Sequence, residues 1–373
     1  MKVVITGAAG FVGRNLLAEL GRDSRYELLP IDVQDGPETL DAVLSVADFV
    51  FHLAGVNRPT DPADFDRGNR GLTEQMLDGL ARHGRAVPVF LSSSVQAARE
   101  NPYGASKRAA EDAVFAWEAR TGGKALVYRL SNLFGKWCRP NYNSVVATFC
   151  HNIARDLPIE VSDPTRELEL VYIDDLLAEC KRALEGNPTP GEDGFCRVPV
   201  SHRVTLGTLA DTLRAFRLSR TTQLLPPLDS DFQRALYGTY LSYLPTDDFA
   251  GYPEMKRDAR GWLAELIKMP GFGQIFVSRT APGITRGNHW HHTKVEKFIV
   301  VEGQAVIRFR PIGGGEVVEY AVAADPVAVV DIPAGYTHSI TNTGTDDLVT
   351  LFWADEVFDP DRPDTYYEEV LRG

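Results

Sequence analysis

A tyrosine and a lysine lie four residues apart in the segment YGASK, residues 103–107. On a helix this spacing puts both side chains on one face. A phenol with a pKa of about 10 is a poor acid–base catalyst at neutral pH, whereas a neighbouring ammonium favours the phenolate and lowers that pKa. We therefore expect Tyr103 to exchange a proton with a substrate beside Lys107. Three serines, residues 92–94, end the preceding strand-like run and can offer a hydroxyl to a carbonyl oxygen.

A glycine-rich turn near the N-terminus has the spacing of a dinucleotide-binding loop. The segment TGAAGFVG, residues 6–13, follows a short apolar run and opens a helical pattern. Gly7 permits the tight turn, Gly10 lets the backbone approach a pyrophosphate, and Gly13 allows the helix to pack closely on the strand. The N–H groups at the start of this helix then face the phosphates. The segment therefore predicts a bound nicotinamide dinucleotide.

Asp32 bears on which nicotinamide cofactor is used, because it ends the second strand-like run, 19 residues after Gly13. An acidic residue at this point commonly hydrogen-bonds the 2′-hydroxyl of the adenosine ribose, which favours NADH over NADPH. A solvated aspartate that begins the next loop explains the residue equally well. The sequence therefore leaves NADH and NADPH as alternatives.

Three histidines and a glutamate in the last quarter of the chain have the spacing of a metal site. His289 and His291, two residues apart on a predicted strand, point to one face of a sheet, and Glu296 returns from the next strand. His338 offers a fourth ligand. Three imidazoles and one carboxylate suit Zn²⁺, Fe²⁺, Ni²⁺ or Mn²⁺, among which we favour Zn²⁺. His292 is an alternative ligand or a candidate base.

Two different kinds of domain must position these groups. Strand-like runs at 2–6, 27–32, 47–55, 86–94 and 124–135 alternate with helical patterns at 11–20, 38–47, 71–84 and about 103–121. This alternation predicts an α/β, doubly wound parallel sheet of the Rossmann type. A further helix is expected at 204–217 and a linker at 221–230. After about residue 250 short strands follow one another closely, which predicts an all-β barrel. We place the domains at 1–246 and 247–373.

Composition narrows the partners and the compartment. The chain has 51 acidic and 39 basic residues and a net charge of −12, so it lacks the basic surface that nucleic acid and anionic membranes require. The four cysteines show no C-x-x-C spacing, which favours free thiols in a reducing compartment. No apolar stretch is long enough to span a bilayer and no signal peptide is evident. We therefore expect a cytoplasmic enzyme whose substrates are small molecules.

The N-terminal motifs together resemble those of extended short-chain dehydrogenase/reductases that act on nucleotide sugars. The resemblance rests on TGAAGFVG, HLAG (52–55), SSS (92–94), YGASK and RLSNLFG (129–135). It implies that Tyr103 donates or accepts the substrate proton and that Lys107 holds the nicotinamide ribose. It also implies that Ser94, or failing that Ser93, binds the substrate oxygen and that Asn132 contacts the sugar nucleotide. The residues expected to bind the cofactor are Gly7, Gly10, Phe11, Val12, Gly13, Asp32, Leu53, Ala54, Gly55, Tyr103 and Lys107.

The C-terminal motifs resemble those of metal-binding cupins, although Val327 replaces the glycine that usually opens the second cupin motif. A reductase joined to a cupin is similar to the bifunctional enzymes of capsular polysaccharide synthesis, and longer segments such as GNHWHHTKVEKF (287–298) share this resemblance. It implies a UDP-sugar substrate whose carbon 3 is epimerised by the cupin and whose 4-keto group is reduced with NAD(P)H. The product would be UDP-N-acetyl-6-deoxy-L-talosamine. Because cupins often pair through their sheets, we expect a homodimer.

Two other functions remain open from the sequence. One is a nucleotide-sugar dehydratase or 4-epimerase in which the cupin serves only for dimerisation. A dehydratase would need a carboxylate pair just after the serine run, where Val95 and Gln96 stand instead. The other is a non-catalytic dinucleotide sensor, but such proteins often lack the tyrosine or the lysine, and this chain has both.

Overall fold

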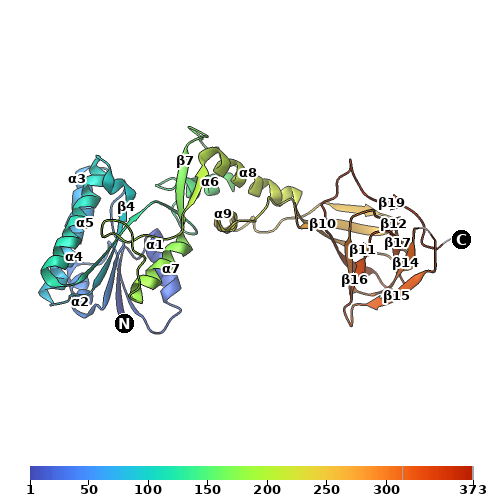
Figure 1. Ribbon diagram of the computed structural model, residues 1–373, viewed down its shortest axis with the longest axis horizontal. Helices are drawn as coiled ribbons and strands as arrows, with labels where there is room; N and C mark the ends of the chain where they lie inside the picture. The colour runs from blue at the N-terminus through green and yellow to red at the C-terminus, as the bar shows by residue number, and fades with distance from the viewer. Residues whose placement is uncertain (313, 372–373) are drawn as a thin grey trace. The chain divides into compact units, whose positions relative to one another are not determined.

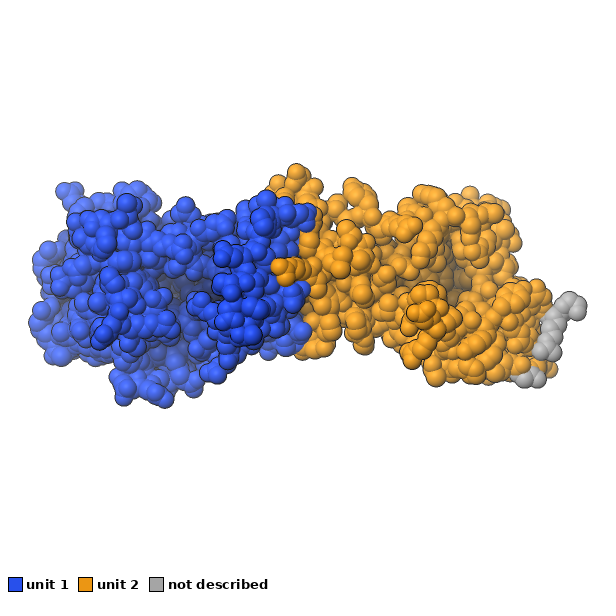
Figure 2. Space-filling model, turned by 90° about the horizontal axis from the view of Figure 1, so that it is seen from above, with its two compact units in different colours: residues 1–213, 230–244 blue, residues 214–229, 245–373 orange. Residues whose placement is uncertain are grey.

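The computed structural model describes residues 1–312 and 314–371, which divide into two compact units. Met1–Leu213 and Ser230–Leu244 belong to unit 1, and Arg214–Asp229 and the chain from Pro245 onward belong to unit 2 (Figures 1 and 2). The segment 214–229 precedes the predicted domain boundary but joins unit 2, because its backbone pairs with a strand there. Leu225 N–H donates to the carbonyl of Lys268 (2.8 Å). The domain boundary after residue 246 stays a prediction.

The central sheet of unit 1 is parallel, with the strand order β2-β1-β3-β4-β5. Its strands are β1 (Lys2–Thr6), β2 (Glu27–Ile31), β3 (Phe49–His52), β4 (Pro88–Ser94) and β5 (Lys124–Leu130). Strands of a sheet that is covered on both faces are apolar at consecutive positions. In β1, Val3 and Ile5 pack into one hydrophobic cluster, whereas Val4 packs into the cluster on the opposite face.

Helices cover both faces of this sheet (Figure 1). Helices α1 (Phe11–Leu20) and α7 (Ile173–Leu184) pack on one face, and α2 (Pro37–Val46), α4 (Leu72–Arg82) and α5 (Pro102–Thr121) pack on the other. The remaining elements of this part of the chain are α3 (Ala63–Phe65), a π-helix (Asp66–Gly71), a 3-10 helix (Val95–Ala98), β6 (Asn132–Phe134), α6 (Val145–Ile153), β7 (Glu167–Tyr172), β8 (His202–Thr205), α8 (Leu206–Thr222) and α9 (Asp231–Leu241). Strands β6, β7 and β8 form a separate small sheet.

The strand order of unit 1 reverses between β1 and β3, and this reversal fixes where a ligand can bind. Loops that leave the carboxyl ends of two such strands turn to opposite faces and open a crevice between them. Here the two loops are the glycine-rich turn after β1 and residues 53–57 after β3. A Cβ on Gly7 would lie 2.7 Å from the backbone nitrogen of Ala54, so the loops touch at the base of this crevice.

Unit 2 consists of two antiparallel sheets around one hydrophobic core. The first has the order β16-β13-β18-β11-β10-β9 and the second the order β15-β14-β17-β12-β19. The strands are β9 (Met255–Asp258), β10 (Gly261–Met269), β11 (Gly273–Thr280), β12 (Thr285–Trp290), β13 (Glu296–Glu302), β14 (Gln304–Pro311), β15 (Val318–Ala323), β16 (Val329–Ile332), β17 (Tyr336–Asn342), β18 (Leu348–Ala354) and β19 (Tyr366–Tyr367).

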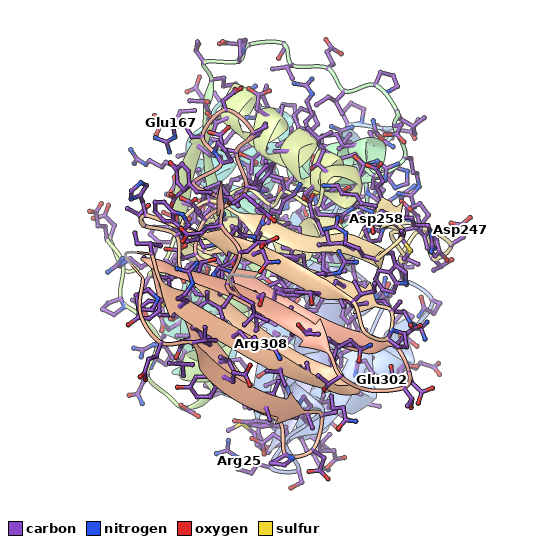
Figure 3. The ribbon with its side chains drawn as sticks, turned by 90° about the vertical axis from the view of Figure 1, so that its right-hand side faces the viewer. Arg25, Glu167, Asp247, Asp258, Glu302 and Arg308 are labelled. Carbon is purple, nitrogen blue, oxygen red and sulfur yellow. The ribbon has the colours of Figure 1, made fainter. Side chains whose placement is uncertain are left out.

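Side chains of the second sheet alternate between the core and the outer surface. In β14, Ile307 and Phe309 join the core with residues of the other sheet, such as Phe298 and Phe352. Arg308, labelled in Figure 3, points the other way and pairs across the strands with Glu319 (2.5 Å). The α/β and all-β parts together confirm the predicted fold class. Within the described ranges, no helix has the length and apolar character needed to cross a membrane.

Candidate active site and metal centre

The tyrosine and the lysine lie at the start of α5, as their spacing predicts. Pro102 occupies the first turn, and the side chain of Asn101 caps the helix by accepting a hydrogen bond from Gly104 N–H (2.8 Å). Tyr103 is half-buried and Lys107 is buried. The Lys107 ammonium donates to the carbonyl of Ser92 at the end of β4 (3.1 Å). Helix α5 and β4 therefore hold the lysine in one position.

Burial dominates the pKa values of this pair. It lowers the pKa of Lys107 to about 8, although the carboxylate of Glu111, one helical turn further along α5, raises it. Burial also raises the pKa of Tyr103, against a hydrogen bond with Ser94 that lowers it. The pKa of Tyr103 is therefore raised and not lowered, because desolvation of the phenolate outweighs the hydrogen bond with Ser94, and a lowering effect of the Lys107 ammonium stays a prediction. Tyr103 is a protonated acid at neutral pH.

The three serines at the end of β4 have three different roles. The hydroxyl of Ser94 faces Tyr103 and also accepts a hydrogen bond from Gln96 N–H (3.2 Å). The hydroxyl of Ser93 points to the other side of the strand and donates to the buried carboxylate of Glu111 (2.5 Å). The hydroxyl of Ser92 donates to the carbonyl of His52 (3.2 Å). Of the two predicted substrate serines, Ser94 is the one whose hydroxyl is directed at the tyrosine.

The glycine-rich turn has the conformation that its sequence predicts. Gly7 adopts a φ of 71°, which favours glycine, and a Cβ on Gly13 would lie only 2.3 Å from the carbonyl oxygen of Gly7. Helix α1 begins at Phe11 without a side-chain cap, so no capping side chain occupies its first N–H groups. Asp32 lies at the end of β2, and its carboxylate accepts hydrogen bonds from Ala9 N–H (2.6 Å) and Val33 N–H (2.8 Å). Its contact with a ribose stays a prediction.

A cavity of about 280 Å³ connects the serines, the tyrosine and the lysine with the start of α1, whereas Gly7, Gly10, Gly13 and Asp32 are not among its lining residues. Its walls include Phe11, Val12, Leu53, Gly55, Ser92, Ser93, Ser94, Tyr103, Lys107 and Asn132, all of which the sequence analysis had singled out. Asn132 is exposed there, and its amide donates to the carbonyl of Glu169 (3.3 Å). The cavity thus brings the predicted tyrosine, lysine, serine and asparagine together beside the crevice of the parallel sheet.

The sequence analysis missed a group of polar residues on the wall of this cavity. Arg139, Tyr142, Asn143 and Ser144 line it. The guanidinium carbons of Arg139 and Arg58 lie 5.2 Å and 5.9 Å from the ring centre of Tyr142. These residues lie in the segments HLAGVNRP and NLFGKWCRPNYNS, where a concentration of arginine, asparagine and tyrosine next to proline was the available signal.

The four predicted metal ligands converge in unit 2, and their ligand atoms all lie within 4.8 Å of one another. His289 lies in β12 and pairs in register with His338 of β17. Glu296 begins β13 in the other sheet. His291 does not lie on the strand as predicted, because β12 ends at Trp290, but it is buried and its ring centre lies 5.0 Å from that of His289.

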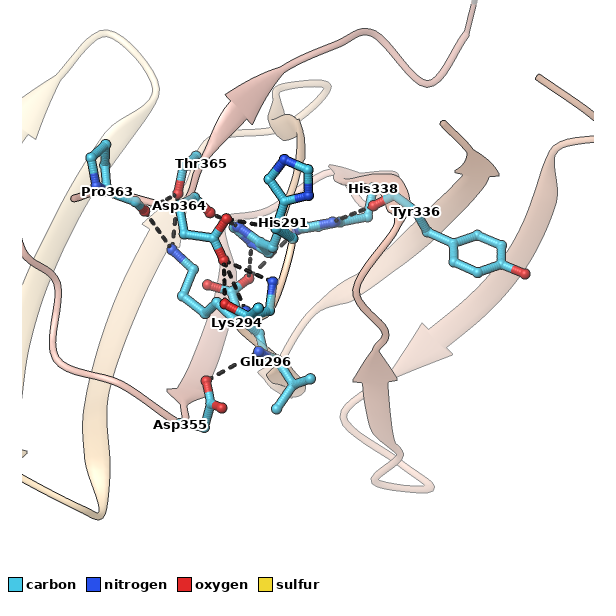
Figure 4. Close-up of polar contacts among 12 residues, drawn as sticks. His291, Lys294, Glu296, Tyr336, His338, Asp355, Pro363, Asp364 and Thr365 are labelled. Carbon is cyan, nitrogen blue, oxygen red and sulfur yellow. Dashed lines mark hydrogen bonds and ion pairs between the residues drawn. The ribbon is translucent and has the colours of Figure 1, made fainter. Parts of the chain in front are cut away.

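Two imidazole nitrogens in this cluster are unsatisfied, which is the signature of a missing ligand partner. Nε2 of His291 and Nε2 of His338 are buried without a hydrogen-bond partner in the described structure, and lie 3.4 Å and 3.5 Å from the carboxylate of Glu296. Nδ1 of His291 donates to the carbonyl of Asp364 (2.6 Å; Figure 4). This hydrogen bond directs the Nε2 lone pair toward the cluster centre. The donor set and its spacing therefore fit a divalent ion such as Zn²⁺.

The charges of the cluster also suit a cation. Burial lowers the pKa of His289 to about 4, so this imidazole is neutral at physiological pH. Burial raises the pKa of Glu296, but the neighbouring imidazoles of His291 and His338 outweigh it and hold this pKa well below its usual range. The exposed His292 lies outside the cluster of four. One buried carboxylate among imidazoles is the arrangement that a divalent metal neutralises.

Comparison with known proteins identifies the N-terminal half. Residues 3–193 match the NAD dependent epimerase/dehydratase family. The chain belongs to this family. Residues 256–366 match a polysaccharide biosynthesis C-terminal domain. UDP-glucuronic acid 4-epimerase from Bacillus cereus, at 18% identity and a TM-score of 0.55, covers 65% of the chain and shows the fold of the family alone.

Two relatives extend over both units. UDP-2-acetamido-2,6-beta-L-arabino-hexul-4-ose reductase from Pseudomonas aeruginosa is 43% identical over 373 residues, which is the full length of both chains. The capsular polysaccharide assembling protein CapF from Staphylococcus aureus is 50% identical, with a TM-score of 0.93 over 99% of this chain and 100% of its own. Another structure of CapF contains the inhibitor 3-isopropenyl-tropolone and has a TM-score of 0.89. This member of the epimerase/dehydratase family therefore shares the fold of CapF over both units.

Proposed function

We propose that this chain acts on a UDP-4-keto-6-deoxy-N-acetylhexosamine at two centres. In this proposal unit 2 is a cupin whose ligand cluster holds a divalent metal, Zn²⁺, and carbon 3 of the sugar is epimerised there. The cavity in unit 1 then reduces the 4-keto group with NADH or NADPH, and the product is UDP-N-acetyl-6-deoxy-L-talosamine for capsule or O-antigen synthesis. The observation that carries the proposal is the convergence of Ser94, Tyr103 and Lys107 in one cavity next to the glycine-rich turn.

The residues of unit 1 fit the reduction of a ketone. A bound nicotinamide supplies the hydride for carbon 4. Tyr103 gives its phenolic proton to the oxygen on carbon 4, so that the ketone gains a hydride and a proton and becomes an alcohol. The raised pKa of Tyr103 keeps this proton available at neutral pH. Ser94, directed at the same phenol, is placed to donate a hydrogen bond to that oxygen, and Lys107 to bind the nicotinamide ribose.

The residues of unit 2 fit the loss and return of the proton on carbon 3. The neighbouring ketone acidifies this proton, and a divalent ion, when bound, would supply a Lewis acid that stabilises negative charge on the oxygen. His289, His291, Glu296 and His338 would hold that ion. His292 lies next to this cluster in the sequence and is a candidate for the base that moves the proton.

The relatives support this proposal from two sides. The Pseudomonas aeruginosa relative is named as a reductase of a UDP-linked hexul-4-ose, and it spans the same length as this chain. The CapF inhibitor is a tropolone, a class of molecule with a ketone and a hydroxyl on adjacent ring carbons. Such an oxygen pair is a donor set for divalent metals, so a tropolone is a direct probe of the proposed centre.

The test is a product assay by NMR in deuterated water. The full chain is incubated with UDP-2-acetamido-4-keto-6-deoxyhexose and either NADH or NADPH. We expect deuterium at carbon 3 and an alcohol at carbon 4, and the preferred cofactor is read from the same spectra. If neither change occurs with either cofactor, the proposed function is wrong.

Two variants separate the centres and serve as controls for each other. Tyr103→Phe should lower the rate of reduction by about 10²- to 10⁴-fold, the usual contribution of a general acid, and leave deuterium uptake at carbon 3 intact. His338→Ala should stop the uptake but still allow reduction of a substrate that is already epimerised. Reduction by Tyr103→Phe at the wild-type rate would remove Tyr103 from the mechanism. Unchanged uptake in His338→Ala would leave unit 2 as a scaffold.

A further inference from the structure

The last residues of the described chain cross the ligand-bearing sheet of unit 2. We call residues 363–370 the C-terminal strap. Its short strand β19 adds to the edge of β12, with Tyr367 opposite His289 and Tyr366 opposite Trp290. Glu368 N–H extends this pairing by donating to the carbonyl of Asn288 (3.0 Å). The strap therefore lies against the strand that carries the first of the four proposed ligands.

Asp364 connects the strap to the segment that follows β12 (Figure 4). Its backbone carbonyl accepts the hydrogen bond from His291 Nδ1 (2.6 Å). Its carboxylate accepts the backbone N–H groups of His292 (2.9 Å), Thr293 (3.0 Å) and Lys294 (2.9 Å). One residue thus fixes both the ring orientation of a proposed ligand and the path of the backbone between two ligands, His291 and Glu296.

The backbone of Asp364 is adapted to this double contact. Its φ of 35° lies in the region that favours glycine and that aspartate and asparagine tolerate better than other residues. The buried side chain of Lys294 supports the same arrangement. Its ammonium donates hydrogen bonds to the carbonyl of Pro363 (3.2 Å) and to the hydroxyl of Thr365 (2.9 Å). The residues on both sides of Asp364 are therefore held as well.

The far end of the strap is anchored to β17, which carries the third imidazole, and to its neighbour β14. Arg310 of β14 is buried at 3% exposure, and it donates to the carbonyls of Val370 (2.9 Å) and Glu369 (2.6 Å). The hydroxyl of Thr337, next to His338 in β17, donates to the carbonyl of Glu368. Val370 is fully buried. Because the buried guanidinium of Arg310 is hydrogen-bonded to strap carbonyls, the strap is packed into unit 2.

We infer that Asp364 is a positioning residue of the metal centre and that the C-terminal strap sets its metal affinity. The inference rests on the proposed metal site. The hydrogen bond to Asp364 fixes the tautomer in which His291 Nε2 offers its lone pair, and the three N–H contacts hold the loop in place before an ion arrives. Loss of such supporting contacts typically weakens metal binding by about 10- to 100-fold.

The test compares three variants of the full chain. Asp364→Gly keeps the backbone conformation and the carbonyl but removes the carboxylate, and Asp364→Asn keeps one acceptor oxygen. Asp361→Asn removes the same charge at an exposed position three residues before Asp364 and is the matched control. Zn²⁺ affinity is measured by competition with a chromophoric chelator. Amide hydrogen exchange of residues 292–294 is measured on the metal-free protein.

We expect the Zn²⁺ dissociation constant to rise by about 10- to 100-fold in Asp364→Gly, by less in Asp364→Asn, and to stay unchanged in Asp361→Asn. Exchange at residues 292–294 should accelerate in Asp364→Gly while the amides of β13 and β14 keep their protection, which shows that the unit remains folded. Wild-type affinity and protection in Asp364→Gly would overturn this inference alone. A wild-type chain that binds no Zn²⁺ would instead overturn the proposed metal centre, and the exchange data would still decide whether Asp364 holds the loop.

Discussion

Lys107, which we place in the proposed active site, should destabilise the folded protein, and its replacement by methionine tests this. Its pKa falls from 10.5 in the unfolded chain to about 8 in the folded one, with burial as the first cause. At about 1.4 kcal/mol per pKa unit, holding the ammonium in the folded protein below pH 8 costs about 3 kcal/mol. Methionine removes this cost, but it also removes the hydrogen bond from the charged ammonium to the Ser92 carbonyl, worth about 2 kcal/mol. We therefore expect Lys107→Met to raise the free energy of unfolding of unit 1 by about 1 kcal/mol at pH 7.

The effect has a defined pH dependence. The folded protein releases the proton of Lys107 at a lower pH than the unfolded chain does, so the folded state binds fewer protons between about pH 8 and 10.5. Wild-type stability should therefore gain a contribution from this group as the pH rises through that window, and Lys107→Met should lack it. The advantage of the variant is largest below pH 8 and shrinks above it.

The assay must report unit 1 by itself, because a chain with two units need not unfold in one step. Urea unfolding of the dinucleotide-free protein with pulsed hydrogen exchange and mass spectrometry reads the peptides of β4, β5 and α5 separately. Lys124→Met, which replaces an exposed lysine of β5, is the control and should change stability little. Both variants should keep the fold, whereas only Lys107→Met should lose reductase activity. A Lys107→Met protein that is less stable than the wild type would refute the reasoning, since the ammonium would then be well compensated by Glu111 and Ser92.

Two further predictions concern the cofactor and the substrate. Asp32→Ala should shift the ratio of the kcat/KM values for NADH and NADPH toward NADPH by about tenfold or more, since one hydrogen bond to a charged group contributes about 1.5–3 kcal/mol. An unchanged ratio would rule out a contact between Asp32 and the ribose. Arg139→Ala should raise KM for the UDP-sugar more than it lowers kcat, because its guanidinium lies on the cavity wall beside Tyr142, where a diphosphate could be bound. Arg22→Ala, at a separate surface cavity, is the control, and an equal effect of the two variants would exclude a specific role for Arg139.

Much of unit 1 follows from local sequence. Helix α1 begins and ends at the predicted residues, 11 and 20, because its leucines have helical spacing and a glycine flanks each end. The start of α5 is equally well specified by the cap at Asn101 and by Pro102. Helix α9 was not predicted, although Ser230 and Gln233 form a capping box at its start. The two prolines just before this box had favoured a linker.

The strands of unit 2 were predicted less exactly, because some of them lack apolar alternation. Strand β12, with the sequence TRGNHW, contains two residues of positive φ, Gly287 and Asn288, and a bulge in its pairing with β17. Only the spacing of its histidines indicated a strand here, and that spacing did not predict that β12 ends before His291. The metal ligands themselves were found because histidine and glutamate at close spacing are informative. Asp364 was not, since its carboxylate binds backbone N–H groups, which carry no sequence signal, and since it lies 73 residues after His291.

The proposed reaction gives a chemical reason for two centres in one chain. The proton on carbon 3 is acidic only while carbon 4 carries a ketone, so epimerisation at carbon 3 is reversible as long as the ketone persists. Reduction at carbon 4 removes the group that acidifies this proton and so fixes the new configuration at carbon 3. The burial that costs stability at Lys107 and raises the pKa of Tyr103 therefore serves the step that makes the sequence of reactions irreversible. On this reasoning, a chain that lacks Tyr103 should exchange the proton on carbon 3 repeatedly and accumulate a mixture of two ketosugars.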